Sequence, residues 1–315
     1  MYVRAVGGEL EASFAEQRPA ILRHCYRMLG SFAEAEELTQ DTFERAWKAR
    51  ESYAGDAPLG HWLMRIATNG CLNALALRKR RALPQLERAA SASYDFGPSD
   101  VERWIAPAPN ALLFPHGSLS QSPEQLTEGR ESVALAFIEL LQRLPAKQRA
   151  ALLLKDVAGW SAEDIAEALE LSVSAVNSAL HRARTLVQRV EPKADPPSPA
   201  TVAAFVQAWE TRDLDALVAL LKRDVSLAMP PYPVWFSGVE SVIGFLRSGR
   251  FASFWSSLAR VVPTSGNARP AFLFRLDGER THSVMLVRFE AEHVAEMVTY
   301  VGQAYFEPFC RGAAV

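Results

Sequence analysis

The chain has 315 residues, of which 49% are hydrophobic and 22% are charged, and its formal net charge at pH 7 is −2. This length and apolar content support two or three folded domains and therefore a soluble, globular protein. No apolar run approaches the roughly 20 residues that cross a bilayer, and the N-terminal residues do not form a signal peptide, so we expect a cytoplasmic protein.

The cysteines and the net charge limit the classes of site further. Cys25, Cys71 and Cys310 are widely spaced, form no CxxC pair and have no His at zinc-finger spacing. Neither a disulfide framework nor a metal is indicated, and we expect no cofactor. A negative net charge is unexpected for a protein that binds DNA unaided, because phosphate contacts need clustered Lys and Arg.

Two amphipathic helices are predicted near the N-terminus, over residues 14–29 and 33–50. The second helix places four carboxylates on one face, at Glu34, Glu37, Asp41 and Glu44. A solvated face is the usual explanation of a charge run. Like charges at this spacing repel one another, however, so a stripe of one sign is better explained by a basic partner surface.

Residues 51–58 form a predicted loop, and a third helix is predicted over residues 59–81. One face of this helix carries an aromatic ring, amides and a cation, and a basic run follows: Trp62, Arg65, Asn69, Asn73, Arg78, Lys79, Arg80 and Arg81. This chemistry suits a surface that stacks on unpaired bases and holds the backbone beside them. The alternative is a buried Trp62 and a solvated basic cap. Gly70 inside the helix costs about 1 kcal/mol relative to Ala, so we expect it to mark close packing or a bend.

Residues 89–121 are rich in Ala, Ser, Pro and Gly and are predicted to form an irregular connector. Trp104, Pro107 and Pro109 make part of this connector too apolar for a purely solvated tether, so we expect it to dock on a folded domain. The run Ser122-Pro123-Glu124-Gln125 then carries three agreeing signals for the start of a helix that reaches about Arg143.

A helix-turn-helix is predicted between Leu144 and Val187. Ser161 caps its first helix, and the second begins at Val173, with an apolar back. The opposite face of the second helix carries groups that read base edges and grip phosphates: Ser174, Asn177, Ser178, His181, Arg182 and Arg184. Further candidates for phosphate contacts are Lys147, Arg149 and Arg189. A helical hairpin with a solvated basic face is the simpler alternative.

The C-terminal third changes from helices to strands. Residues 201–221 and 239–246 have helical patterns, whereas residues 271–276, 283–290 and 294–301 alternate or run apolar as strands do. Helices followed by strands predict an α+β domain after the proline-rich segment 192–199.

Two stretches resemble the sigma-70 family of transcription initiation factors. AEAEELTQDTFERAW with HWLMRIATNGCLNALALRKRR resembles region 2, and LPAKQRAALLLKDVAGWSAEDIAEALELSVSAVNSALHRAR resembles region 4. Because no larger domain lies between them, the resemblance is to the extracytoplasmic-function (ECF) group. It implies that the acidic helix docks on the clamp coiled coil of RNA polymerase core, that residues 62–81 open and hold the minus-10 strand, and that the recognition helix reads the minus-35 element. Polymerase would then supply most of the grip on DNA, which explains the net charge.

The connector and the C-terminal segment carry two further resemblances. Trp104, Pro107 and Pro109 form a motif similar to the Trp-x-x-Pro-x-Pro linker of sigma factors with an extra C-terminal domain. MPPYPVWFSGVESVIGFL and the order of elements resemble the SnoaL-like family, cone-shaped domains with a curved sheet, helices and an internal pocket. Candidates for such a pocket are Tyr232, Trp235, His282, His293, Glu296 and Tyr300. His and Glu are common acid and base groups, but no nucleophile stands beside a base, so structural roles are favoured.

The sequence therefore predicts a multidomain chain with two all-α sigma domains followed by an α+β SnoaL-like domain. The predicted segments are a region 2 domain (1–88), a linker (89–121), a region 4 domain (122–191), a proline-rich linker (192–199) and a regulatory domain (200–312). We expect a non-enzymatic sigma factor that binds polymerase core and promoter DNA and is modulated in cis by its C-terminal domain. The alternatives are a DNA-targeted enzyme and a repressor that binds DNA without polymerase. Further candidate partners are an unidentified small ligand of the pocket and a separate anti-sigma factor.

Overall fold

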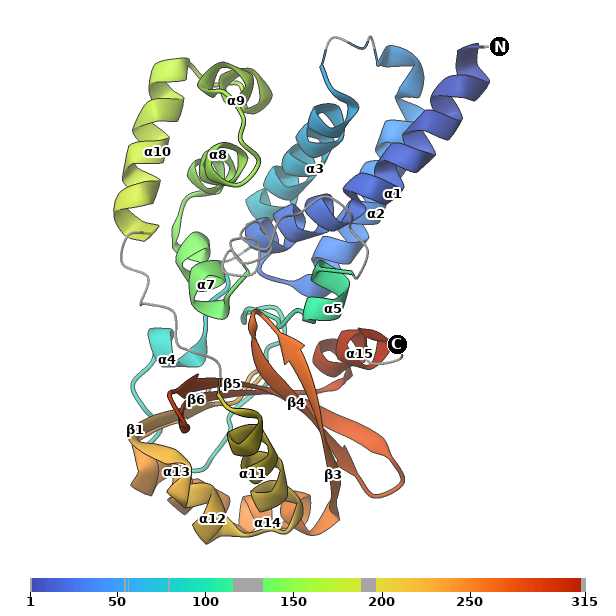
Figure 1. Cartoon of the computed structure of the whole chain (residues 1–315). Coiled ribbons are helices and arrows are strands. Elements are labelled where there is room, and N and C mark those ends of the chain that lie inside the picture. Colours follow the sequence, from blue (N-terminus) through green and yellow to red (C-terminus); the bar gives the residue numbers. More distant parts are fainter. Residues whose placement is uncertain are drawn as a thin grey trace. The chain divides into compact units, whose positions relative to one another are not determined.

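The computed structural model describes residues 2–53, 55, 57–78, 80–115, 133–187 and 197–312. The chain divides into two compact units, which Figure 1 colours along the sequence. The helical unit contains the described residues up to Arg80 and those from Leu112 to Val187. The sheet unit contains Arg81–Ala111 and the described residues from Pro197 onward.

The N-terminal half of the helical unit consists of three helices and a short 3-10 turn: α1 (Tyr2–Leu29), α2 (Phe32–Lys48), η1 (Arg50–Ser52) and α3 (Leu59–Ala76). Helix α1 begins well before the predicted residue 14, and α3 ends before the predicted residue 81. Gly70 lies in α3 where a Cβ atom would stand 3.1 Å from the Leu38 side chain on α2. The expectation that Gly70 marks close packing is therefore confirmed.

The second half of the helical unit contains α7 (Leu135–Arg143), α8 (Ala146–Asp156), α9 (Ala162–Leu169) and α10 (Val173–Val187). Ser161 caps α9 as predicted, because its hydroxyl accepts the Asp164 backbone N–H at 3.0 Å. Glu170 ends α9 in the left-handed conformation, with φ of 52°, and the tight connection to α10 completes the helix-turn-helix. The predicted helix start at residues 122–125 lies outside the described residues.

The sheet unit contains one mixed sheet and seven helices among its described residues. The helices are α4 (Pro84–Glu87), α5 (Asn110–Leu113, which continues into the helical unit), α11 (Pro199–Glu210), α12 (Leu214–Ala219), α13 (Val239–Leu246), α14 (Gly249–Ser257) and α15 (Gln303–Gly312). The strands are β1 (Leu221–Ala228), β2 (Trp235–Ser237), β3 (Leu258–Gly266), β4 (Arg269–Leu276), β5 (Arg280–Glu290) and β6 (His293–Val301). Their order is β2-β1-β6-β5-β4-β3, and only the β1–β6 pair is parallel among the described strands.

Strands β4, β5 and β6 agree with the prediction, whereas β1 was not predicted, and its first residue, Leu221, lies in the stretch expected to be helical. Leu217, Leu221 and Val225 recur at a spacing of four, which imitates a helical stripe. The register of β1 shifts between Leu221 and Ser226, so the strand lacks the strict alternation that would have identified it. Strands β2 and β3 and helices α4, α5, α14 and α15 were not predicted either, and the predicted helix over residues 201–221 is divided into α11 and α12.

The core of the sheet unit lies between the sheet and the helices that cover one of its faces. Figure 1 shows α11, α12, α13 and α14 on one side of the curved sheet and α15 on the other. Phe205 and Trp209, one turn apart on α11, place their rings 4.8 Å and 5.0 Å from those of Phe272 and Phe274 on β4. This aromatic packing fixes α11 on that face of the sheet.

Residues 81–111 belong to the sheet unit, although the sequence suggested that the first domain extends to residue 88. This segment lies between the two helical halves in sequence, and we call it the linker. No described helix is both long and apolar enough to cross a membrane.

Candidate nucleic-acid interface

The acidic stripe on α2 is largely presented to solvent. Glu37 and Glu44 are exposed, and Asp41 pairs with Arg45 one turn along the same helix, at 3.4 Å. Glu34 differs, because its carboxylate forms an ion pair with Arg78. The stripe therefore offers three carboxylates to a partner, while the fourth holds the segment that follows α3.

The α3 face predicted to hold the minus-10 strand is partly covered within the helical unit. Asn69 and Asn73 are exposed, and the half-buried Trp62 ring lies 5.1 Å from that of Tyr53 in the preceding loop. Arg65 is exposed, but its guanidinium donates to Glu167 on α9 at 2.7 Å. His61 stacks on Trp160, with ring centroids 4.6 Å apart. The helix-turn-helix domain therefore contacts the start of this face.

The basic run after α3 is divided among different environments. Arg80 is exposed, Arg78 pairs with Glu34, and Lys79 lies outside the described residues. Arg81 is only 5% exposed, and its Nε donates to the Glu102 carbonyl in the sheet unit at 3.0 Å. The expectation for Arg81 is corrected: it is a buried group of the sheet unit and not part of an exposed basic surface.

The recognition helix α10 has the predicted division into two faces. Val176, Leu180 and Ala183 are buried, and the predicted DNA-reading residues are exposed: Ser174, Asn177, Ser178, His181, Arg182 and Arg184. Arg184 nevertheless has an intramolecular partner, because its guanidinium binds Asp156 at the end of α8 at 2.5 Å and 3.1 Å. This hydrogen bond raises the pKa of Arg184.

These contacts predict different salt dependences for two neighbouring arginines. We expect Arg182→Ala to weaken promoter binding by the reconstituted holoenzyme and to reduce the slope of log K against log salt by about one, as for the loss of one phosphate contact. Arg184→Ala should change the slope less, because Asp156 competes with phosphate for its guanidinium. Equal changes in slope for the two variants, measured by fluorescence anisotropy, would contradict this assignment.

Arg149 was expected to contact phosphate, and this expectation is also corrected. Its side chain is 3% exposed and lies in the interior of the helical unit. The guanidinium donates to the Met28 carbonyl of α1 and to Gln142 and Leu144 at the end of α7. Arg149 therefore joins the two halves of the helical unit and does not face DNA. Lys147 is exposed apart from a bond to the Leu169 carbonyl at 3.0 Å, and Arg189 lies outside the described residues.

His24 makes the helical unit sensitive to acid. Burial, with the Arg27 charge as a second cause, lowers the pKa of His24 from 6.5 to about 3. Its Nε2 lies 3.0 Å from Thr68 Oγ1, whose hydroxyl donates to the Met64 carbonyl, so the neutral ring donates to Thr68. Below pH 6.5 His24 binds a proton in the unfolded chain but stays neutral in the folded chain. The stability of the folded state therefore falls as the pH falls from 6.5 toward 3.

We therefore expect the wild-type helical unit to lose about 1.3 kcal/mol more stability than His24→Gln between about pH 7.5 and about pH 5.5. Glutamine keeps a donor for Thr68 but does not titrate. Urea denaturation at the two pH values measures the difference, and equal acid sensitivity of the two chains would contradict the assignment to His24.

The residues proposed for a C-terminal pocket separate into two groups. Tyr232 and His282 line a cavity in the sheet unit, which is described below. Trp235, His293, Glu296 and Tyr300 do not line it: Trp235 Nε1 donates to the Arg88 carbonyl at 2.9 Å, and His293 is exposed. Glu296 and Tyr300 are excluded from the cavity by strand alternation. Because Met297 and Thr299 of β6 face the cavity, Glu296 and Tyr300 face the other side of the sheet.

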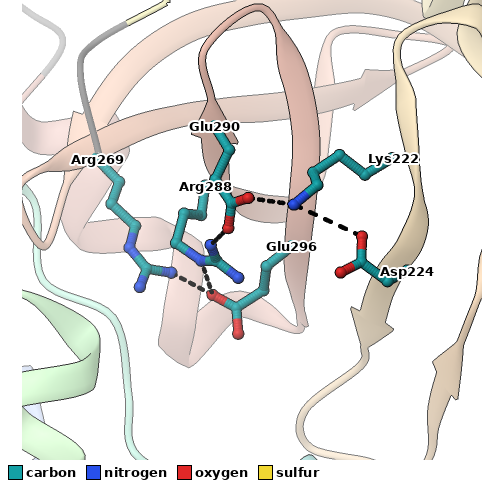
Figure 2. Close-up of polar contacts among 6 residues, drawn as sticks. All are labelled: Lys222, Asp224, Arg269, Arg288, Glu290 and Glu296. Atoms are coloured by element: carbon teal, nitrogen blue, oxygen red, sulfur yellow. Dashed lines mark hydrogen bonds and ion pairs between the residues drawn. The ribbon is translucent and has the colours of Figure 1, made fainter. Parts of the chain in front are cut away.

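Glu296 instead belongs to an ion-pair network on that other side. Figure 2 shows Arg269 and Arg288 converging on its carboxylate, at 2.5 Å and 3.6 Å, and the network continuing through Glu290 and Lys222 to Asp224. Gln85 of the linker also donates to Glu296, at 3.2 Å. Burial opposes ionisation of Glu296, but the two guanidiniums outweigh it and lower the pKa of this carboxyl. Glu296 is therefore an ionised anchor for the linker and not a catalytic acid.

The linker docks on the sheet unit through its apolar motif. Trp104 is 0% exposed, and Pro107 and Pro109 are buried. Trp104 Nε1 donates to the Pro231 carbonyl at 2.8 Å, and Ala108 exchanges two hydrogen bonds with the buried Asn267, at 2.8 Å and 3.0 Å. Sequence reasoning missed Asn267, whose only signal is its place in the short turn between β3 and β4.

The described residues hold no cluster of three or more His, Cys, Asp or Glu side chains that could bind a metal. Cys25, Cys71 and Cys310 are free thiols. Burial, followed by a hydrogen bond with Cys25, raises the pKa of Cys71, so this thiol stays protonated.

Comparisons with known proteins agree with this geometry. Residues 14–81 match the family described as Sigma-70 region 2, and residues 134–187 match Sigma-70, region 4. A chain that carries both, with an exposed recognition helix, is a sigma-70-type factor. The ECF RNA polymerase sigma factor SigG of Mycobacterium tuberculosis is 36% identical over 317 residues, which cover 96% of this chain and 84% of SigG. The chain belongs to the ECF RNA polymerase sigma factors.

Other relatives match parts of the chain or its fold. The RNA polymerase sigma-H factor of Pseudomonas aeruginosa is 28% identical over 179 residues, 54% of this chain and 82% of that factor. The crystal structure of the ECF factor SigJ of Mycobacterium tuberculosis has a TM-score of 0.60 at 17% identity, covering 95% of this chain and 98% of SigJ, and so shares its fold. The predicted fold class, with two all-α sigma domains and an α+β domain, is confirmed.

Family membership also decides between the functional alternatives. Sigma factors are transcription initiation factors and not enzymes, so the DNA-targeted enzyme and the independent repressor are set aside. The chain binds RNA polymerase core and promoter DNA.

Proposed function

We propose that the sheet unit restrains this ECF sigma factor in cis by holding the linker between region 2 and region 4. The docking of the linker carries this proposal: Trp104 is fully buried against Pro231, and Ala108 is paired with Asn267. A linker that is bound along a folded domain has lost the freedom of a flexible tether. Regions 2 and 4 can then separate only as far as the undocked residues allow.

We infer that initiation in the cytoplasm uses three surfaces. The first is the acidic stripe of α2 for polymerase core, in which Glu37, Asp41 and Glu44 are offered to the partner and Glu34 holds Arg78. The second is the α3 face with the following basic residues for the minus-10 strand: Trp62, Arg65, Asn69, Asn73, Arg78, Lys79 and Arg80. The third is the front of α10 for the minus-35 element, where Arg184 also holds Asp156. The bond from Arg65 to Glu167 supports the restraint, because phosphate must displace this carboxylate.

Promoter-specific transcription with purified polymerase core tests the proposal. Asn267→Gly removes the amide that holds Ala108, and glycine tolerates the φ of 49° at this position. We expect it to raise initiation at least about twofold relative to the full chain, while Ser265→Ala, an exposed change in the same strand end, leaves it unchanged.

Truncated chains that end near Pro192 and near Pro199 should raise transcription, as Asn267→Gly does. If transcription falls in these versions and in Asn267→Gly, the sheet unit is required and the restraint is refuted. If no variant differs from the full chain, the docked linker does not regulate initiation.

A further inference from the structure

A cavity of about 210 Å³ lies inside the sheet unit. Its walls come from the concave face of the sheet and from helices α11, α13 and α14. Most of the lining is aromatic or thioether, including Trp209, Phe245, Phe254, Phe274 and Met285. An apolar cavity of about 150 Å³ is known to accept benzene, so this one has room for a molecule of about two rings.

Four residues of the lining carry buried polar atoms that have no hydrogen-bond partner within the described part of the chain. These atoms are Trp209 Nε1, His282 Nδ1, Ser283 Oγ and Thr299 Oγ1. Trp209, Ser283 and Thr299 are 2%, 1% and 9% exposed, so solvent does not satisfy them. Buried polar groups are nearly always paired in folded proteins, because leaving one unpaired is costly. Four such groups from three elements around one cavity indicate that a bound molecule supplies their partners.

The charges around the cavity define the class of ligand. No Asp or Glu is found among the described lining residues. The one lining guanidinium, that of Arg250, is exposed and pairs with Asp95 at 3.3 Å. Burial, followed by the Arg280 charge, lowers the pKa of His282, so its ring is neutral at pH 7. The lining therefore suits an uncharged ligand whose oxygen atoms accept from the indole N–H and exchange hydrogen bonds with the hydroxyls.

Phe96 connects the cavity to the linker. This linker residue is part of the cavity wall, and its ring lies 5.0 Å from that of Tyr232 and 5.9 Å from that of Phe245. Hydrogen bonds hold the linker on both sides of Phe96, from Ser91 N to the Trp235 carbonyl at 2.8 Å and from Asp100 N to the Pro231 carbonyl at 3.0 Å. A molecule in the cavity that touches Phe96 gains this contact only while the linker is docked.

We propose that the cavity binds an uncharged, flat molecule of about ten to fifteen non-hydrogen atoms with one or two hydroxyl or carbonyl oxygens, and that its binding strengthens linker docking. The consequence for transcription rests on the proposed restraint in cis, whereas binding and docking do not. Both can therefore be measured on the full chain without polymerase.

Titration calorimetry with 1-naphthol, a two-ring phenol, tests the site. We expect saturable binding with one site per chain and a Kd on the order of 100 µM. Thr299→Val removes an unpartnered hydroxyl at nearly constant volume, so it should weaken binding about fivefold or more without lowering the thermal midpoint of the free chain. Thr264→Val, on β3 outside the cavity lining, should leave binding unchanged.

Two outcomes would overturn the site. One is the absence of saturable binding below about 1 mM, or equal affinity for naphthalene, which lacks the hydroxyl. The other is a lower thermal midpoint for Thr299→Val with unchanged affinity, which would make the hydroxyl a structural group bonded to internal water.

Hydrogen exchange tests the coupling to the linker. Saturating 1-naphthol should slow exchange at the Ser91 and Asp100 amides at least about fivefold, and Phe96→Ala should abolish this slowing while the probe still binds. Binding without slower exchange would retain the site but refute its coupling to the linker. If both effects occur and transcription does not respond to 1-naphthol, the proposed restraint in cis fails and the ligand site stands.

Discussion

Replacing Trp104 with alanine is expected to lower the free energy of unfolding of the sheet unit by about 3–5 kcal/mol. The indole is fully buried, lies under the Arg103 guanidinium at 5.1 Å and donates its N–H to Pro231. Backbone bonds from Ala82 N to the Arg103 carbonyl and from Ile105 N to the Ala82 carbonyl hold the chain on either side. The loss therefore opens a cavity and leaves the Pro231 carbonyl without this donor.

Calorimetry is the appropriate measurement, because a chain with two compact units need not unfold in one step. The transition of the sheet unit should move down by on the order of 10 °C, while that of the helical unit stays in place. Trp104→Phe should fall between wild type and alanine, since it keeps most of the apolar contact but loses the hydrogen bond to Pro231 and part of the ring volume. Val101→Ala, at a position 48% exposed in the same linker, should change stability by less than about 0.5 kcal/mol.

A change of less than about 1 kcal/mol for Trp104→Ala would mean that the linker contributes little to the sheet unit. The docked linker would then be a weak contact, and the proposed restraint would lose its physical basis. If Trp104→Ala instead destabilises the sheet unit and raises transcription, the same contact that stabilises the domain also restrains initiation.

The sequence was most informative where local chemistry and periodicity agreed. The helix-turn-helix was predictable because the Ser161 cap, the apolar stripe of α10 and the short connection at Glu170 are all encoded within a few residues. Strands β4, β5 and β6 were predictable because their buried faces give continuous apolar runs. Strand β1 was not predicted, because its residues lack the strict alternation of buried and exposed side chains.

The charged side chains were harder to place, because composition gives the sign of a charge but not its partner. Arg81 and Arg149 have the charge of DNA-contacting residues, yet the Arg81 guanidinium donates to a carbonyl 21 residues along the same segment, and that of Arg149 donates to a carbonyl 121 residues away. Glu296 and Thr299 are three residues apart on β6, so strand alternation places them on opposite faces of the sheet, but only the folded structure shows which face lines the cavity. Phe96 could not have been assigned to a cavity, because its partners come from helices and turns far along the chain.

The second large effect is expected at Arg149, a buried cation whose bonded partners are neutral. Its acceptors are the carbonyls of Met28, Gln142 and Leu144 and the side-chain oxygen of Gln142. Met28 lies in the last turn of α1, and Gln142 and Leu144 lie at the end of α7, so the negative ends of two helix dipoles converge on the guanidinium. Burial lowers the pKa of Arg149 to about 10, which still leaves it charged at pH 7.

Arg149→Met should destabilise the helical unit by about 3–5 kcal/mol, because it leaves four buried acceptors without their donor. Arg149→Lys should recover only part of this loss, since an ammonium group cannot reproduce the planar fork that spans these acceptors. The control is Arg143→Met, which removes one exposed pair with Glu139 on α7 and should cost no more than about 0.5 kcal/mol. Urea denaturation followed by circular dichroism measures all three variants.

The same substitution tests how the two sigma regions are held together. Arg149 lies on α8 of region 4, whereas Met28 lies on α1 of region 2, and Gln142 reinforces the connection by donating to the Arg27 carbonyl at 3.2 Å. A chain that lacks these hydrogen bonds retains other described links between the two regions, such as Arg65 with Glu167, which is an exposed and therefore weak pair. We therefore expect Arg149→Met to increase the radius of gyration measured by small-angle scattering. An unchanged radius with full loss of stability would mean that Arg149 supports region 4 alone and that other contacts keep the regions together.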